Sequence, residues 1–459
     1  MPRNPIAARL RRLPPGQALI LYYATAILAG AAALSLPIAS KGPPLSFIDA
    51  LFTATSAQCV TGLTVVDTGA GLTLFGQFVV LLLIQLGGLG ITTFSVYLFF
   101  FLRLGVGVHG RWMIQETLLH TPVSSLRELI TEIIKMALII EGAGAVVLCA
   151  VFIPDLGPGM GAFTALFHSV SAFCNAGFSL FTDSLTGYRK DAVMNLTIMT
   201  LIVLGGIGFL VIREAKDLFL HRGPGRRPKL SLHSSIVLWT TAVLILGGAV
   251  MIGVMERNYS LAGAGLREGA LTALFQSVTA RTAGFNTIDM NLLRVSTLLL
   301  VVFLMFVGAS PGSAGGGIKT TSLALFVAIL ASRLKGIPHT NVFRRTVSEE
   351  TVTRVLALVM LAIMVVGTAL FALLLVQHPG TSARQSGDIF LQYFFETVSA
   401  FATVGLTMGA TAKLNAGGKI IIIALMFVGR IGLLTVAFTI AKRLSPIAPR
   451  YAEENIMVG

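Results

Sequence analysis

Long runs of apolar residues alternate along the chain with short polar segments. Runs such as 17–39, 72–102 and 194–212 reach the roughly 20 residues that an α-helix needs to cross about 30 Å of hydrocarbon. Several more runs of this kind follow them. The pattern therefore predicts an all-α polytopic membrane protein, because a water-soluble surface could not accommodate so much apolar side chain.

One motif of Ser, Thr, glycine and large apolar residues occurs four times between these runs. The copies read LFTATSAQCVTGLTVVD from Leu51, LFHSVSAFCNAGFSLFTDS from Leu166, LFQSVTARTAGFNTIDM from Leu274 and FFETVSAFATVGLTMGA from Phe394. Their marker glycines are Gly62, Gly177, Gly284 and Gly405. A second glycine follows each marker after 24 to 28 residues, within an apolar run, at Gly87, Gly205, Gly308 and Gly429. Since a long apolar run also precedes each motif, the chain is predicted to repeat one unit four times.

The segment before each marker glycine has about three helical turns, which is too short to cross a bilayer. A segment that enters and returns can expose backbone polar groups only to protein or to an aqueous cavity. The C-terminal end of a short helix would favour a cation there, and carbonyl groups of the extended residues after it could replace the cation's hydration shell. The expected fold is therefore four helix–pore loop–helix repeats, with eight transmembrane helices and four re-entrant pore helices around a central pseudo-fourfold pore.

The predicted filter takes three residues from each motif. They are Val60, Thr61, Gly62, Asn175, Ala176, Gly177, Thr282, Ala283, Gly284, Thr403, Val404 and Gly405. The third motif is one residue shorter between its aromatic residue and its glycine, and it carries Arg281 near the filter. That arginine is interpreted as a tie between the pore helix and its neighbours rather than as an ion contact.

The motifs and the basic connections divide the chain into repeats and cytoplasmic segments. The predicted repeats are 17–103, 126–219, 233–335 and 345–443. The predicted cytoplasmic segments are the N-terminus 1–16, the connections 104–125, 220–232 and 336–344, and the C-terminus 444–459. The chain has 34 Lys and Arg residues against 20 Asp and Glu residues, a net charge of +14. Most of the basic residues lie in or beside these segments. The positive-inside rule then places both termini in the cytoplasm, and the scattered charge offers no single patch for nucleic acid.

A glycine-rich stretch, GASPGSAGGGIKTTS from Gly308 to Ser322, interrupts the second apolar run of the third repeat. Pro311 removes a backbone donor, and each glycine weakens a helix by up to about 1 kcal/mol relative to alanine. Backbone groups exposed at this depth must face a cavity, so we expect a loop that lies across the pore just below the filter. A static kink that fills space between helices is the alternative interpretation.

Single ionisable residues lie within several apolar runs. Arg430, in FVGRIGLLT, should face the cavity because its burial in lipid is costly, and there it could bond the carbonyl groups of the loop. Lys319 has two interpretations of equal weight, extension to the cytoplasmic side and a role in the pore. Glu141 and Glu396 are interpreted as paired or capping residues rather than as a proton relay.

The four motifs, the interrupted third repeat and the arginine of the fourth repeat together resemble the Ktr/Trk/HKT superfamily of potassium transporters, over nearly the whole chain. With no additional helix pair before the first repeat, the chain looks more like a Ktr-type membrane subunit than a Trk-type subunit. The resemblance implies potassium selectivity from glycine at all four filter positions, and it implies that the interrupting loop is the gate. The predicted gate residues are Ser310, Pro311, Gly312, Ser313, Ala314, Gly315, Gly316, Gly317 and Arg430.

The same resemblance implies a homodimer with a separate pore in each subunit, seated on a cytoplasmic ring of RCK/KTN-type nucleotide-binding regulatory subunits. It also implies the inner (plasma) membrane of a bacterium, crossed several times and surrounded by lipids. No covalently bound cofactor is expected; K+ is the transported ion, and Na+ is left open as an activating or coupling ion. The basic stretch 221–230 is a candidate contact for the regulator, with a solvated, lipid-facing loop as the equal alternative.

Two other motifs carry no function in this interpretation. GVGVHG at 105–110 satisfies a dinucleotide fingerprint but has no βαβ pattern around it. In GSAGGGIKTT, Ile318 separates Gly317 from Lys319, which a phosphate-binding loop requires to be adjacent. The three cysteines have neither CxxC spacing nor a histidine at ligand spacing. Neither enzyme activity nor a metal site other than the K+ filter is therefore expected.

Three functions remain after these exclusions. The leading interpretation is a gated potassium uptake pathway driven by the electrochemical gradient. An alternating-access cation symporter, coupled to Na+ or H+, would bind its substrate at the midplane between broken helices. The potassium-binding subunit of an ATP-driven pump is the third interpretation. Four parallel motifs in one orientation favour the pore, and pump subunits are usually longer.

Overall fold

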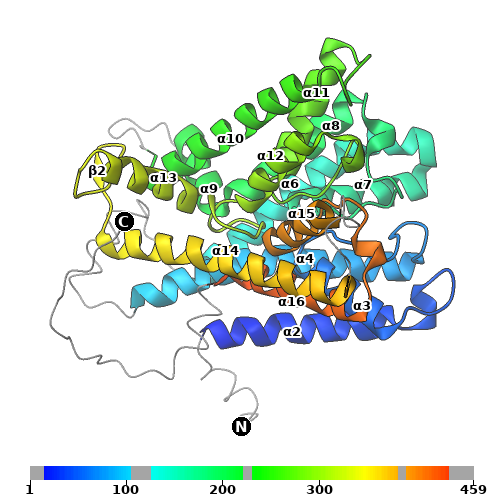
Figure 1. Ribbon diagram of the computed structural model, residues 1–459. Coiled ribbons are helices and arrows are strands. Elements are labelled where there is room, and N and C mark those ends of the chain that lie inside the picture. Colours follow the sequence, from blue (N-terminus) through cyan, green and yellow to red (C-terminus); the bar gives the residue numbers. More distant parts are fainter. Residues whose placement is uncertain (1–14, 105–125, 221–229, 381–388, 434–459) are drawn as a thin grey trace, which may run out of the picture.

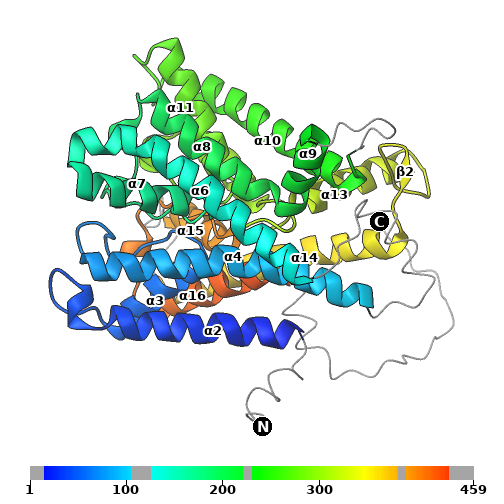
Figure 2. The same cartoon turned by 180° about the vertical axis from the view of Figure 1, so that it is seen from behind.

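The computed structural model describes residues 15–104, 126–220, 230–380 and 389–433, and this part of the chain is mostly helical (Figure 1). This confirms the predicted helical class. Long helices run across the molecule, and the short helices α3, α7 and α11 gather toward one end of it, in the front view and from behind (Figures 1 and 2). The all-α expectation did not include one small hairpin, in which β1 (Asn341–Val342) pairs antiparallel with β2 (Arg345–Thr346).

The helices form four sets in chain order. The first set contains α2 (Pro15–Leu34), α3 (Phe47–Gln58) and α4 (Leu74–Leu104), and the second contains α6 (Leu126–Leu156), α7 (Pro158–Phe173), α8 (Ala192–Ile207) and α9 (Phe209–Leu220). The third contains α10 (Leu232–Glu256), α11 (Leu266–Thr279), α12 (Val295–Phe306) and α13 (Thr320–Leu334), and the fourth contains α14 (Glu349–Gln377), α15 (Ile389–Ala402) and α16 (Ala416–Ile431). Each set therefore runs from a long helix through a short one to a last helix, which is in two pieces in the second and third sets.

Side-chain caps decide where several of these helices begin. The Ser46 hydroxyl accepts a hydrogen bond from the N–H of Asp49 over 3.2 Å at the start of α3. Asp191, Ser231 and Asn415 accept equivalent bonds at the starts of α8, α10 and α16. Each cap satisfies one of the N–H groups that a helix leaves without a partner in its first turn.

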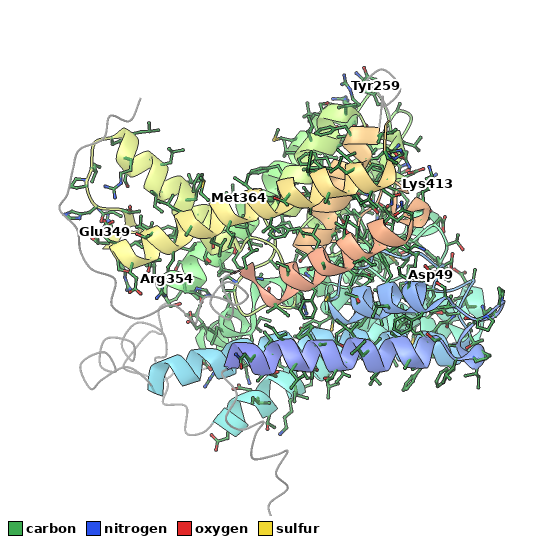
Figure 3. All side chains as sticks on the ribbon, turned by 60° about the horizontal axis from the view of Figure 1, so that its bottom comes forward. Asp49, Tyr259, Glu349, Arg354, Met364 and Lys413 are labelled. Atoms are coloured by element: carbon green, nitrogen blue, oxygen red, sulfur yellow. The ribbon has the colours of Figure 1, made fainter. Side chains whose placement is uncertain are left out.

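Four helices of the described residues are each long and apolar enough to cross a membrane alone, namely α2, α6, α10 and α14. Only 17 to 33% of the residues in their most apolar windows are buried inside the protein. Met364, halfway along α14, is 65% exposed, whereas the charged Glu349 and Arg354 lie at one end of the same helix (Figure 3). The Ser- and Thr-rich helices α3, α7, α11 and α15 are instead buried over most of their length. An apolar exterior around a more polar interior is the distribution expected in hydrocarbon.

The four sets close into a ring, because the last helix of each set contacts the short helix of the next. α4 packs against α7, α8 against α11, α12 against α15, and α16 returns to α3. Two ion pairs strengthen this ring. Lys419 Nζ lies 2.5 Å from Asp49 Oδ1 and joins α16 to α3, and Arg189 Nε lies 3.3 Å from Glu268 Oε1 and joins the second set to the third. Burial opposes ionisation of Asp49, but bonds from Lys419 and Ser46 outweigh it and lower the pKa of this carboxyl group.

The second set differs from the expected uninterrupted span over 194–212. α8 ends at Ile207, and the chain turns by 101° into α9. Gly208, between the two helices, has a φ of 90°, which an L side chain rarely adopts. The run is apolar throughout, so its composition gave no sign of the break.

The second glycine of three motifs allows the last helix to approach the end of its own short helix. A side chain at Gly87, Gly205 or Gly429 would collide with the backbone carbonyl of Gln58, Phe173 or Phe401, respectively. In the third set, Gly308 instead lies against the backbone of Gly316 in the interrupting loop. In these three sets, the spacing of the two glycines thus reflects one contact between the short helix and the last helix.

We expect Gly429→Ala to destabilise the protein by about 1–3 kcal/mol, because the added methyl group collides with the carbonyl of Phe401. The measurement is the apparent Tm of the detergent-purified protein at one fixed scan rate. Gly367→Ala in α14 is the matched control, since its methyl group would meet nothing within 4 Å. Equal thermal stability of the two variants would contradict the close contact.

Candidate functional site

The residues around each marker glycine have the same backbone conformation in all four sets. The residue two places earlier has a positive φ, which is 56° at Val60, 59° at Asn175, 69° at Thr282 and 50° at Thr403. The marker glycine is also left-handed, with a φ of 91° at Gly62, 68° at Gly177, 78° at Gly284 and 91° at Gly405. Residues other than glycine are strained in this region, so the surrounding structure must impose it. Alternation of left- and right-handed residues turns successive carbonyl groups toward one side of the strand, as in potassium filters.

Hydrogen bonds from the short helix hold these strands in the first and fourth sets. The N–H of Thr61 donates to the Ser56 carbonyl over 2.8 Å, and the hydroxyl of the same serine accepts from the N–H of Gly62 over 3.1 Å. Ser399 repeats this bond to the N–H of Gly405 at the same 3.1 Å. One serine therefore fixes two consecutive residues of the strand.

In the second and third sets the hydroxyl at the same position donates a hydrogen bond instead of accepting one. The hydroxyl of Ser171 donates to the carbonyl of Phe178 over 2.8 Å, and that of Thr279 donates to the carbonyl of Phe285 over 2.6 Å. Both hydroxyl-bearing residues are fully buried. Every set thus has a hydroxyl group that bonds to the strand from this position, although its partner changes.

The four strands meet around one axis. A side chain at each marker glycine would collide with the carbonyl group before the marker glycine of the next set: Gly62 with Ala176, Gly177 with Ala283, Gly284 with Val404, and Gly405 with Thr61. This order is cyclic and returns to its start. The helices α3, α7, α11 and α15 all end immediately before these strands, so the negative ends of their dipoles face the same region. The described residues contain no cluster of three or more His, Cys, Asp or Glu residues that could hold a metal ion.

The glycine-rich stretch between α12 and α13 forms a loop against the inner ends of these strands. The N–H of Gly316 donates to the hydroxyl of Thr403 over 3.1 Å, and a side chain at Gly315 would collide with the hydroxyl of Thr282. Ser310 and residues 313–316 are buried, whereas Pro311 and Gly312 are partly exposed. The loop thus lies directly beside the strands of the third and fourth sets.

The loop also contacts the break between α8 and α9. The N–H groups of Ser310 and Ala314 donate to the carbonyls of Gly206 and Gly205 over 3.0 and 3.2 Å. The N–H of Phe209 in turn donates to the carbonyl of Gly312 over 3.2 Å. The backbone groups left open by the break in one helix therefore pair with those of the interrupted helix.

Arg430 binds this loop from α16. Its side chain is 3% exposed, and its guanidinium donates to the carbonyl of Ala314 and, over 2.7 Å, to the carbonyl of Gly87. Its Nε lies 3.3 Å from the hydroxyl of Tyr23, which itself donates to the Gly87 carbonyl over 3.0 Å. The sequence singled out the arginine but missed Tyr23, because a lone tyrosine in an apolar helix carries no distinguishing pattern.

The other charged residues of the apolar segments also have partners. Lys319 Nζ donates to the carbonyl of Gly315 over 2.6 Å, so this side chain turns to the loop and does not extend to the cytoplasmic side. Arg281 donates to the hydroxyl of Thr241 in α10 over 3.4 Å, which agrees with a tie between helices. Glu141 accepts from Gln85 Nε2 over 2.9 Å, in agreement with a paired carboxylate.

Several predicted features lie outside the described residues. They are the termini 1–14 and 434–459, the GVGVHG motif, and nearly all of the basic stretch 221–230.

Comparison with known proteins gives three kinds of match. The model of the TrkH family, described as a cation transport protein, matches residues 17–446. The "Ktr system potassium uptake protein B" of Bacillus subtilis is 40% identical over 453 residues, covering 98% of this chain and 97% of that protein. The protein of the same name from Vibrio alginolyticus is 39% identical, covering 96% of this chain and 94% of that protein. The "Potassium/sodium uptake protein NtpJ" of Enterococcus hirae is 37% identical, covering 98% of this chain and 98% of that protein.

The solved structure of the potassium transporter TrkH from Vibrio parahaemolyticus matches with a TM-score of 0.72 at 20% identity, over 94% of this chain and 84% of that one. At that identity the match shows a shared fold. The family resemblance inferred from the motifs is confirmed by the matches in sequence. The chain belongs to the TrkH family of cation transport proteins.

Proposed function

We propose that this chain is the potassium-translocating membrane subunit of an uptake system, with a filter built from the four strands around the marker glycines. The observation that carries the proposal is the cyclic contact of these glycines with the carbonyl groups of Thr61, Ala176, Ala283 and Val404. Carbonyl oxygens held around one axis replace the hydration shell of a dehydrated cation. The names of the three curated relatives, all potassium uptake proteins, point to the same ion.

The loop 308–317 is the gate in this proposal. It lies against Thr282 and Thr403 at the inner end of the filter, and Arg430 holds it there. A fixed guanidinium beside the pathway also repels a permeating cation electrostatically. Flux then requires the loop to leave this position. The free energy of that movement is set by the loop's hydrogen bonds to Gly205, Gly206 and Arg430.

A cytoplasmic nucleotide-binding ring is the proposed regulator, acting on a homodimer of this chain in the inner membrane with both termini in the cytoplasm. The relatives' names include a Ktr system, which implies a second component. The exposed hairpin between α13 and α14, with Arg344 in its turn and Arg345 in β2, offers a basic surface on the side of the predicted cytoplasmic connection. The basic stretch 221–230 remains a second candidate for this contact.

A Na+-coupled symporter is the second candidate function. One observation favours it, since a relative covering 98% of the chain is named a potassium/sodium uptake protein. A symporter needs its coupling ion in order to move potassium, whereas a gated pore does not.

The purified protein in liposomes should accumulate Rb+ or K+ when an inside-negative voltage is imposed, in the absence of ATP and of Na+. A voltage of about 100 mV supplies about 2.3 kcal/mol per elementary charge, which is enough to drive the ion inward. Uptake of radioactive Rb+ is the measurement, with protein-free liposomes as the control. Flux that appears only with a Na+ or H+ gradient would instead support the symporter, and silence without ATP would support a pump subunit.

Gly62→Ser should lower the preference for K+ over Na+ by about tenfold or more, equivalent to about 1.4 kcal/mol or more. The added side chain collides with the Ala176 carbonyl at a residue whose φ is 91°, so the ring of oxygens must shift. The ratio of K+ to Na+ uptake in the same liposomes measures this. Gly42→Ser is the control, because a Cβ there meets nothing within 4 Å. A retained preference in Gly62→Ser would count against the filter.

Deletion of residues 312–316 should raise the flux of the isolated subunit by about tenfold, because it removes the obstruction together with the bonds of Gly312 and Ala314 to Phe209 and Gly205. Arg430→Gln should act in the same direction through loss of the charged bond to Ala314. Arg333→Gln, which removes an exposed arginine paired with Glu349, is the control for the loss of charge. Unchanged flux that still responds to the regulator would exclude gating by this loop and favour a static kink.

A further inference from the structure

A polar side chain occupies one equivalent position in all four short helices. It lies nine residues before the marker glycine in the first, second and fourth sets and eight before it in the shorter third set. The residues are Thr53, His168, Gln276 and Glu396. All four are buried, with exposed fractions of 0 to 1%. Buried polar groups are costly unless they are hydrogen-bonded, so four of them at one position call for an explanation from their partners.

In three sets this side chain bonds to a hydroxyl group that lies just beyond the marker glycine. Thr407 Oγ1 donates to Glu396 Oε1 over 2.9 Å, and it follows Gly405 by two residues. Ser179, two residues after Gly177, lies with its hydroxyl 3.1 Å from His168 Nε2. Each bond therefore joins the middle or second half of the short helix to the segment that follows the marker glycine.

The third set repeats the contact at the limit of hydrogen-bonding distance. Gln276 Nε2 lies 3.5 Å from the hydroxyl of Thr287, which follows Gly284 by three residues. In the second set, His168 Nδ1 faces the Thr164 carbonyl at 2.8 Å, so this nitrogen carries a proton and Nε2 is the atom that faces Ser179.

The first set is the exception and shows what replaces the contact. Thr53 donates to the Asp49 carbonyl in its own helix over 2.8 Å and does not reach the strand. The segment after Gly62 is held from α4, where Gln77 Nε2 donates to the carbonyls of Thr68, Gly69 and Leu72 over 3.1 to 3.3 Å. Every filter strand is therefore tethered beyond its glycine, in three sets by the short helix and in one by α4.

Glu396 differs from its counterparts because it carries a carboxyl group and contacts more of the chain. The backbone groups of Met408 and Thr411 also lie beside its carboxyl group, although its Oε2 has no hydrogen-bond partner of good geometry among the described residues. Glu396 thus holds residues 407–411, the outer continuation of the fourth strand, against α15.

We propose that Glu396 is a positioning residue that determines ion selectivity. Together with His168 and Gln276 it holds the segments just beyond the marker glycines in place. The proposal rests on the filter assigned above. Discrimination between K+ and Na+ depends on how well the carbonyl oxygens keep their number and positions around the ion. A strand released beyond its glycine can move its carbonyl toward the smaller ion, so release at Glu396 lowers the preference for K+.

The test compares K+ and Na+ uptake in liposomes for the full-length protein with Glu396→Ala, Glu396→Gln and Thr407→Val. Loss of a hydrogen bond to an acidic group is expected to lower the K+ preference about tenfold in Glu396→Ala and, from the other side of the same bond, in Thr407→Val. Glu396→Gln should stay within about twofold of the parent protein, because an amide oxygen still accepts from Thr407. Thr407→Val keeps the test decisive if Glu396→Ala does not fold.

Thr397→Val is the matched control, since the Thr397 hydroxyl bonds only the Tyr393 carbonyl of its own helix among the described contacts. Its K+ preference should not change. An unaltered preference in both Glu396→Ala and Thr407→Val would overturn the proposal, as would an equal loss in Thr397→Val. Gly62→Ser, measured in parallel, separates the filter assignment from the positioning role of Glu396. If Gly62→Ser loses the K+ preference while Glu396→Ala keeps it, the filter assignment stands and the positioning role is wrong. If both variants keep the preference, the filter assignment itself is wrong.

Discussion

The need to satisfy every backbone polar group at membrane depth governs this structure. The chain breaks a helix there twice, between α8 and α9 and between α12 and α13, and the two breaks satisfy one another. Carbonyl groups of Gly205 and Gly206, at the end of α8, accept from the loop, and the N–H of Phe209 donates back to Gly312. A break in one segment alone would leave these groups without partners, so the two irregular segments depend on each other.

The four sets have the same arrangement of helices and strand but make different contacts with the loop. All four contribute a strand with the same left-handed residues and a hydroxyl at the same position of the short helix. The second and third sets supply the paired breaks that seat the loop, whereas the first and fourth supply Tyr23, the Gly87 carbonyl and Arg430, which hold it from the opposite side. The four strands have near-fourfold symmetry, but the loop beside them is held by asymmetric contacts.

Much of the site was visible in the sequence because it repeats. The motifs predicted which strands belong together, and the isolated Arg430 in an apolar run predicted a buried partner, which is the loop at Ala314. The break at Gly208 was missed because a run of Leu, Ile and Gly with no proline reads as a continuous helix. Tyr23 was missed because its role comes from residues more than 60 positions away, and Lys319 was open because its stem could have reached either the loop or the cytoplasmic side.

The sequence by itself determined the membrane class, the fourfold repeat and the family, because these depend on hydropathy and on local motifs that recur at fixed spacing. Only the tertiary structure decided that the repeats close into a ring, which carbonyl group each marker glycine meets, and how the broken helices pair. The physical reason is that backbone groups carry no sequence signal of their own. Their partners are set by how the helices pack, and residues far apart in the chain become neighbours only through that packing.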